Sequence, residues 1–335
     1  MQNLTKGMTA LNGNNAYIFA SANLRAKENT GSAVERLASF SNAHTVEELY
    51  RAAANAWNIS EAEASAGIFD LAMANAVSDI RSAVPDPSVF APLLYKYDCT
   101  NVKLAIKYRI LGESADGHLM ECGSIPSEVI LKALKNGDWS CLPTHMKNAA
   151  EESESLYRKT GEARVIDLTL DRACFKAMKA DAEKGGVQLI SEIVSLRADG
   201  INLLSSMRLR NSGDVSLFER VFLPVGNVPY SAFVKNGVLA DLPALYQTLN
   251  DGKLKNVIKT VCDGNLTIAE IEKLLEDTVL SLLPPIKYMA YGPEVVVRYL
   301  LVREAEITNC RIICAGLTNG KDTDSTKERM RSSYV

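Results

Sequence analysis

The chain has 335 residues, of which 47% are hydrophobic, 23% charged and only 7% aromatic. This length allows two or three domains of ordinary size, and the composition supports a buried core and is too apolar for a disordered chain. The 37 basic and 40 acidic residues give a formal net charge of -3, which excludes a globally basic surface of the kind that binds nucleic acid.

Helix signals follow one another along the first half of the chain. Capping boxes begin helices at Thr45 and Ser60, and Pro85 ends the second of these helices at about Val84. The next predicted helix begins near Ser88 and ends at Leu111, before Gly112. Three further helices are predicted over residues 144–159, 166–184 and 187–210.

The second half gives the same signals. A third capping box, at Thr267, begins a helix over residues 271–283. Pro293 begins a last long helix that we expect to end at Ala315, with Gly316 as its cap. Residues 163–170 form the best strand candidate, but helix remains the favoured interpretation there. We therefore predict an all-α fold.

Other composition signals limit the classes of site. No stretch approaches the roughly 20 apolar residues of a membrane-spanning helix, so we expect no direct membrane insertion. Seven cysteines are an odd number and form no Cys-x-x-Cys motif. Buried thiols are therefore favoured over disulfides or a zinc site, although Cys310 and Cys314 could share a helix face. We predict no metal and no cofactor.

One pattern occurs three times, each time inside a long predicted helix: an acidic residue followed three positions later by asparagine. The three pairs are Asp98 with Asn101, Asp199 with Asn202, and Glu306 with Asn309. The acidic residues are 101 and 107 positions apart. Asn-Gly, Leu-Pro and single-proline positions between the helices repeat at a similar interval. The pattern predicts three helical segments, over residues 1–124, 125–227 and 228–335, arranged with pseudo-threefold symmetry.

Each acid and asparagine share one face of their helix, because a spacing of three residues is nearly one turn. The favoured interpretation is structural: the side chains bind neighbouring helices or loop backbone. A polar lining that meets a partner is the alternative. Catalysis is disfavoured, because the pairs lack a nucleophile, a metal or a second titratable partner.

Basic residues accompany the pairs on the same predicted helices. Lys103 and Arg109 follow the first pair, Arg208 and Arg210 follow the second, and Arg303 precedes the third. They are interpreted either as solvated helix surface or as contacts for a partner. We take these residues, the three acid–asparagine pairs and Arg25 as candidate partner-binding residues.

Several segments resemble one known family in the order in which they occur. The run from Tyr97 to Lys103, with Arg109 and Gly112 after it, is similar to a signature of the C subunit of the archaeal and bacterial V-type ATPases, the family of the eukaryotic d subunit. Residues 299–313 resemble the long C-terminal helix of that family. Tyr17 with residues 22–26 resembles its N-terminal motif, and residues 329–334 its short final helix.

The resemblance implies a fold and a role. Members of the family have three similar helical domains in a funnel shape. They sit on the cytoplasmic face of the membrane, on the ring of proteolipid subunits, and their central cavity holds the foot of the central shaft. The resemblance therefore implies a non-catalytic rotor connector that couples rotation to ATP hydrolysis or synthesis and to proton or other ion transport. It also implies a peripheral protein that is a monomer within a larger complex.

Two other classes of protein remain as alternatives. A helical scaffold or adaptor unrelated to rotary ATPases would also be all-α, but solenoid repeats are shorter, at 30 to 50 residues. An enzyme is disfavoured, because the sequence holds none of the common phosphate-binding, zinc-protease or serine-hydrolase motifs. We expect the isolated chain to be soluble, monomeric and inactive towards ATP.

Overall fold

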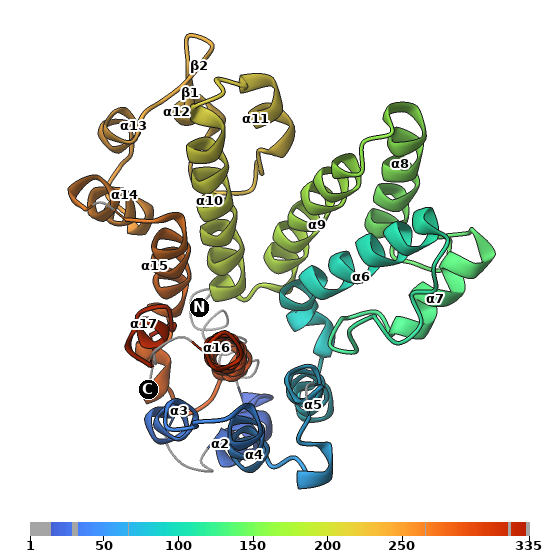
Figure 1. Ribbon diagram of the computed structural model, residues 1–335, viewed down its shortest axis with the longest axis vertical. Helices are drawn as coiled ribbons and strands as arrows, with labels where there is room; N and C mark the ends of the chain where they lie inside the picture. The colour runs from blue at the N-terminus through green and yellow to red at the C-terminus, as the bar shows by residue number, and fades with distance from the viewer. Residues whose placement is uncertain (1–14, 29–32, 66, 265, 321–322, 333–335) are drawn as a thin grey trace, which may run out of the picture. The chain divides into compact units, whose positions relative to one another are not determined.

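The computed structural model describes residues 15–28, 33–65, 67–264, 266–320 and 323–332 (Figure 1). The chain forms two compact units. The terminal unit combines Met1–Pro87 with Glu276–Val335, and the central unit is Ser88–Leu275. Nearly all regular structure in the described residues is helical, so the all-α prediction is confirmed. The predicted three-segment division rests on repetition in the sequence and stays a prediction.

The terminal unit is built around the longest helix, α16. This helix packs against four helices from the start of the chain and against the short helix that follows it (Figure 1). The elements are α2 (Ile18–Glu28), α3 (Ala33–Ser41), α4 (Val46–Trp57), α5 (Ile68–Ala83), the 3-10 helix η3 (Pro284–Tyr288), α16 (Pro293–Thr318) and α17 (Thr323–Glu328).

The central position of α16 follows from its composition. Val295, Val296 and Val297 are all buried although consecutive side chains point in different directions. A helix that is apolar on several sides is stable only when other helices surround it. The predicted end of this helix at Gly316 is wrong, because Gly316 lies inside it. A Cβ at Gly316 would lie 2.5 Å from Thr326 Oγ1, so glycine here allows the close approach of α17.

The central unit begins with long helices. α9 packs against α6, α8 and α10. Residues 163–170 lie largely in α9, as the favoured helical interpretation requires. The elements are the 3-10 helix η2 (Pro87–Phe90), α6 (Ala91–Leu111), α7 (Ser127–Asn136), α8 (Thr144–Thr160), α9 (Arg164–Gly185), α10 (Gln188–Arg210) and α11 (Val215–Val221).

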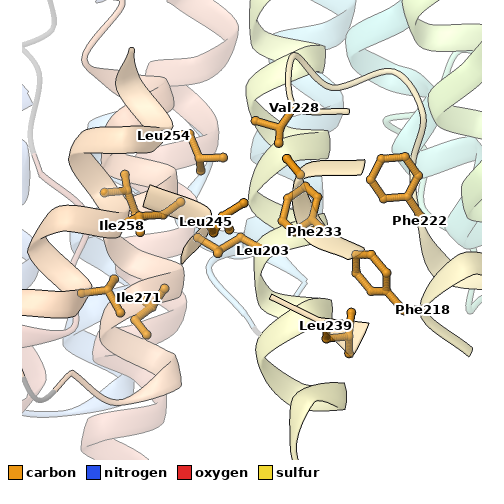
Figure 2. Close-up of a cluster of buried hydrophobic side chains, with 13 residues drawn as sticks. Leu203, Phe218, Phe222, Val228, Phe233, Leu239, Leu245, Leu254, Ile258 and Ile271 are labelled. Atoms are coloured by element: carbon orange, nitrogen blue, oxygen red, sulfur yellow. The ribbon is translucent and has the colours of Figure 1, made fainter. Parts of the chain in front are cut away.

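Short elements follow α10 and close a hydrophobic core around its second half. Phe218, Phe222 and Phe233 pack ring against ring in this core, beside Leu203 of α10 (Figure 2). The elements are α12 (Tyr230–Phe233), the strands β1 (Val234–Lys235) and β2 (Val238–Leu239), α13 (Leu242–Thr248), α14 (Lys253–Asp263) and α15 (Ile268–Leu280), which contains the boundary between the units.

The β-hairpin was not predicted from the sequence. Its turn residues Asn236 and Gly237 have φ angles of 51° and 74°. Asn-Gly favours this left-handed turn, so the dipeptide was the signal for it. The similar dipeptide at Asn136 instead ends α7, with Gly137 as a left-handed cap. The two Asn-Gly positions therefore repeat in the sequence but differ in structure.

The capping predictions have mixed outcomes. At Thr45 and Thr267 the hydroxyl accepts the backbone N–H of the residue three positions later, as predicted. The prediction at Ser60 is wrong. A 3-10 turn, η1 (Glu61–Glu63), follows Ser60, and α5 begins at Ile68 after Gly67, because the chain leaves helical geometry at Ala64. Of the predicted final helix, Arg329 and Met330 follow α17, and Tyr334 lies outside the described residues.

Candidate functional site

The three asparagines of the repeated pattern make the same contact. Each side-chain amide pairs with both backbone polar groups of one residue further along the chain. Asn101 donates to the carbonyl of Met120 and accepts its N–H, both at 2.8 Å. Asn202 pairs with Leu223 at 2.9 and 2.8 Å. Asn309 pairs with Arg331 at 3.1 and 2.7 Å.

These contacts satisfy the polar groups of three buried asparagine side chains, and at Leu223 those of a buried backbone as well. The side chains are 0%, 0% and 3% exposed at Asn101, Asn202 and Asn309. A buried amide or carbonyl left without a hydrogen bond costs about 1–3 kcal/mol. Each asparagine therefore fastens a returning chain segment to its long helix, which is the structural role favoured from the sequence.

The aspartates of α6 and α10 bind the same two segments as the asparagines, a few residues further along the chain. Asp98 accepts the N–H of Ile125 at 2.9 Å, and Asp199 accepts the N–H groups of Asn227 and Val228, each at 3.0 Å. Burial raises the pKa of Asp199, and the backbone donors oppose this shift.

A glycine makes each aspartate contact possible. A Cβ at Gly123 would lie 2.2 Å from Asp98 Oδ1, and one at Gly226 would lie 2.1 Å from Asp199 Oδ1. Three residues after each glycine, a proline immediately precedes the next helix, Pro126 before α7 and Pro229 before α12. From the sequence we identified the prolines and missed the glycines. The Gly-x-x-Pro spacing, repeated at an interval of 103 residues, was the signal that could have identified both loops.

Glu306 of α16 departs from this arrangement. Its carboxylate accepts hydrogen bonds from Arg36 Nε at 2.8 Å and from the indole N–H of Trp57 at 3.1 Å. Arg303 lies 3.6 Å from the same carboxylate, with its guanidinium over the Trp57 ring. Glu306, Arg36 and Arg303 are all at least nine-tenths buried. The third acid therefore lies between two buried arginines and is a shared counter-charge for them.

The basic candidates of α6 are held by carboxylates of the same unit. Lys103 pairs with Asp171 of α9 at 2.5 Å. Arg109 pairs with Glu154 of α8, which also accepts the indole N–H of Trp139 at 3.2 Å. These two side chains therefore contribute to packing between helices.

Arg208 and Arg210 of α10 lie at the surface. Arg208 pairs with Glu272 at 2.6 Å, and Arg210 lies 4.0 Å from Asp241. Both arginine side chains are more than half exposed. Their ion pairs are of the exposed kind that contributes little to stability, so both guanidiniums can exchange these partners for others.

Arg25 is held within the terminal unit. Its guanidinium donates to the backbone carbonyls of Ile286 and Lys287, at 3.5 and 3.4 Å, and to that of Met289. It therefore caps the 3-10 helix η3. Of the twelve candidates, the three acid–asparagine pairs and Arg303 are buried, Arg25, Lys103 and Arg109 are partly buried, and only Arg208 and Arg210 are exposed.

The remaining candidate chemistry is limited. All seven cysteines are free thiols, and the prediction that they are buried is wrong for Cys141 and Cys262, which are exposed. The described residues contain no group of three His, Cys, Asp or Glu side chains arranged to hold a metal ion. Within the described part of the chain, no helix combines the length and the apolar character needed to cross a bilayer.

Comparison with known proteins agrees with the sequence resemblance. Residues 47–329 match the family model described as ATP synthase (C/AC39) subunit. The C subunit of the V-type sodium ATPase of Enterococcus hirae is 23% identical to this chain over 261 residues, which are 76% of this chain and 78% of that protein. As a V-type ATPase component of this kind, the chain is non-catalytic. The chain belongs to the ATP synthase (C/AC39) subunit family, which includes the C subunit of V-type ATPases.

Proposed function

We propose that this chain is the central-rotor connector of a V-type ATPase or ATP synthase. It sits on the cytoplasmic side of the membrane on the proteolipid ring, holds the foot of the central shaft and turns with both. The family match over residues 47–329 carries this proposal, and the name of the Enterococcus hirae relative supports a membrane ion-pumping complex. The chain is a monomer within that complex.

The contacts inside each unit suit a part that transmits torque. A connector must turn without its loops shearing away from its helices. In this chain each long helix of the repeated pattern holds a later segment through the amide of an asparagine that is at least 97% buried. Buried hydrogen bonds and close packing resist such displacement.

We further propose that the chain consists of three segments of common design, over residues 1–124, 125–227 and 228–335. The two partners of each asparagine contact fall within a single one of these segments. The aspartate contacts reach one residue past each of the first two boundaries, to Ile125 and Val228. The design therefore supports these boundaries to within a few residues.

Co-purification tests the proposed partners. A tagged chain is isolated from gently detergent-solubilised membranes and the bound proteins are identified by mass. We expect a proteolipid and the shaft subunits in constant ratio to the tagged chain. Recovery of the chain without them, under conditions in which the rest of the complex stays assembled, would contradict the proposal.

Charge reversal then tests the exposed arginines. Arg208→Glu and Arg210→Glu change exposed side chains with weak ion pairs, so the fold should survive. We expect reduced recovery of partners with the double variant and normal recovery with the charge-reversed control Arg172→Glu on α9. Equal recovery of partners by all of these proteins would remove Arg208 and Arg210 from the candidate interface.

A further inference from the structure

The three long helices of the repeated pattern end at nearly the same distance from their asparagines. Counting from each asparagine, a glycine with positive φ follows at the eleventh position: Gly112, Gly213 and Gly320, with φ of 75°, 66° and 60°. The three helix ends therefore share a register. The two residues before each glycine are exposed in all three cases.

Two of these helix ends carry polar residues at the exposed positions and one does not. The pair is Asn211-Ser212 after α10 and Thr318-Asn319 at the end of α16. At the end of α6 it is Ile110-Leu111, with Ile110 39% and Leu111 70% exposed. A single exposed aliphatic residue needs no explanation, but two adjacent ones at a position that is otherwise polar indicate a contact.

Two arginines, Arg109 of α6 and Arg158 of α8, lie near the end of α6. Arg109 and Arg158 lie close enough for the charge of Arg158 to lower the pKa of Arg109, in addition to the effect of burial. Glu154 neutralises only Arg109, and Arg158 reaches that residue through its backbone carbonyl, at 3.3 Å. Among the described residues Arg158 has no carboxylate partner, and the exposed Lys159 follows it.

The corresponding end of α10 is arranged differently. There Arg208 and Arg210 face Glu272 and Asp241. Both arginines at the end of α10 therefore face a carboxylate, whereas Arg158 near the end of α6 faces none among the described residues, although the exposed Glu113 follows the apolar pair.

We propose that Ile110, Leu111 and Arg158 form a docking surface for an acidic segment of another subunit, one that places an apolar side chain on Leu111 and a carboxylate at Arg158. The proposal rests on the proposed function, because it takes the partner from the same ATPase complex. The apolar pair supplies most of the contact, and the arginine orients the partner and selects against a basic one.

Competition between two chains in one cell tests this surface. Wild-type chain and the variant Ile110→Asn with Leu111→Ser, which carries the residues of the α10 end, are produced together with different tags. The ratio in which they enter the complex is measured by mass spectrometry. We expect the wild type to be favoured by about tenfold or more, because two exposed apolar side chains lose their contact.

Matched variants separate this result from a folding defect. Val238→Thr replaces another exposed apolar residue, 63% exposed, and should enter the complex as well as the wild type. Arg158→Gln should be disfavoured by about two- to fivefold, and less so at high salt. Equal thermal unfolding of all variants would show that the comparison is one of binding.

The outcomes distinguish the two proposals. If wild-type chain enters the complex and the Ile110→Asn, Leu111→Ser variant enters equally well, the docking surface is wrong and the proposed function stands. If the wild-type chain does not enter the complex, the proposed function fails. If sedimentation shows that the isolated wild type forms a dimer that the variant does not, the surface binds a second copy and the assigned partner is wrong.

Discussion

In α6 and α10 the acid three positions before the asparagine faces backbone N–H groups, whereas in α16 it faces two arginines. The asparagine contact is the same in all three helices. An amide side chain can pair with any backbone peptide, so this contact tolerates different loop sequences. The acidic residue binds backbone N–H groups where a glycine lies beside it, as in α6 and α10, and binds arginines where these are buried beside it, as in α16. Its contact therefore differs from helix to helix.

The comparison predicts that the acid of α16 contributes most to stability. Glu306→Ala removes the buried carboxylate that faces Arg36 and Arg303, and breaking a buried ion pair by removing one partner costs about 3–5 kcal/mol. Trp57 lies in the terminal unit and Trp139 in the central unit, so urea unfolding of a Trp139→Phe background reports on the terminal unit. Asp70→Ala is the control, because Asp70 forms an exposed pair with Arg311 of the same helix as Glu306 and its loss should cost at most about 1 kcal/mol.

A smaller loss is expected from the asparagine contact. Asn202→Ala leaves the N–H and carbonyl of Leu223 unpaired, at a cost of about 2–4 kcal/mol. Trp139 fluorescence in a Trp57→Phe background reports on the central unit. The exposed Asn211→Ala should change the free energy of unfolding by less than about 0.5 kcal/mol. Equal effects of the two alanine variants would show that the paired contact does not hold the loop.

The glycine beside Asp199 gives a still smaller effect. Gly226→Ala places a Cβ against the Asp199 carboxylate and should cost about 1–3 kcal/mol. Gly252→Ala, at an open position before α14, should cost at most about 1 kcal/mol. If crowding is the cause, adding Asp199→Ala to Gly226→Ala costs less than the sum of the two single changes. Strict additivity would contradict this explanation.

The smallest effect concerns pH. The pKa of Asp199 is raised by burial from its ordinary value of 3.8, so the folded chain binds this proton more tightly than the unfolded chain. The contribution to stability is therefore full below the ordinary pKa and is lost as the pH rises through the raised value. Wild-type stability minus that of Asp199→Asn, measured in urea titrations, should therefore fall as the pH rises above about 4, the ordinary pKa range of an aspartate. A rise over this range would show that the amide donors outweigh burial.

The sequence predicts helices well and contacts less well. Hydrophobic spacing, proline and glycine positions located the long helices α6, α8, α9 and α10 of the central unit, because these signals are local, whereas the shorter helices α7 and α11 to α14 were not predicted. The end of α16 was misplaced because Gly316 was taken as a helix cap. Its role is to allow close packing against Thr326, and a sequence does not distinguish these two uses of glycine. The hairpin at Asn236 was missed because each strand has only two residues.

The candidate site shows the same limit. The acid–asparagine spacing identified side chains with a common task, and the three asparagines share it. Arg109 was a candidate for binding a partner protein, but it pairs with Glu154, which lies 45 positions further along the chain. Residue spacing within one helix cannot reveal such a contact with another helix. The exposure of Ile110 and Leu111 was not predicted from the sequence, because both residues continue the apolar character of their helix and only the structure shows that they lie at the surface.

Rotation with the ring is the central claim, and a reversible cross-link tests it most directly. In the assembled complex, this chain is joined to a proteolipid of the ring through a reducible linker and the rate of ATP hydrolysis is measured before and after reduction. We expect no change, because both parts turn together, whereas the same linker from this chain to a stationary part of the complex should block hydrolysis until it is reduced. Inhibition by the cross-link to the ring, relieved by reduction, would contradict the proposed role.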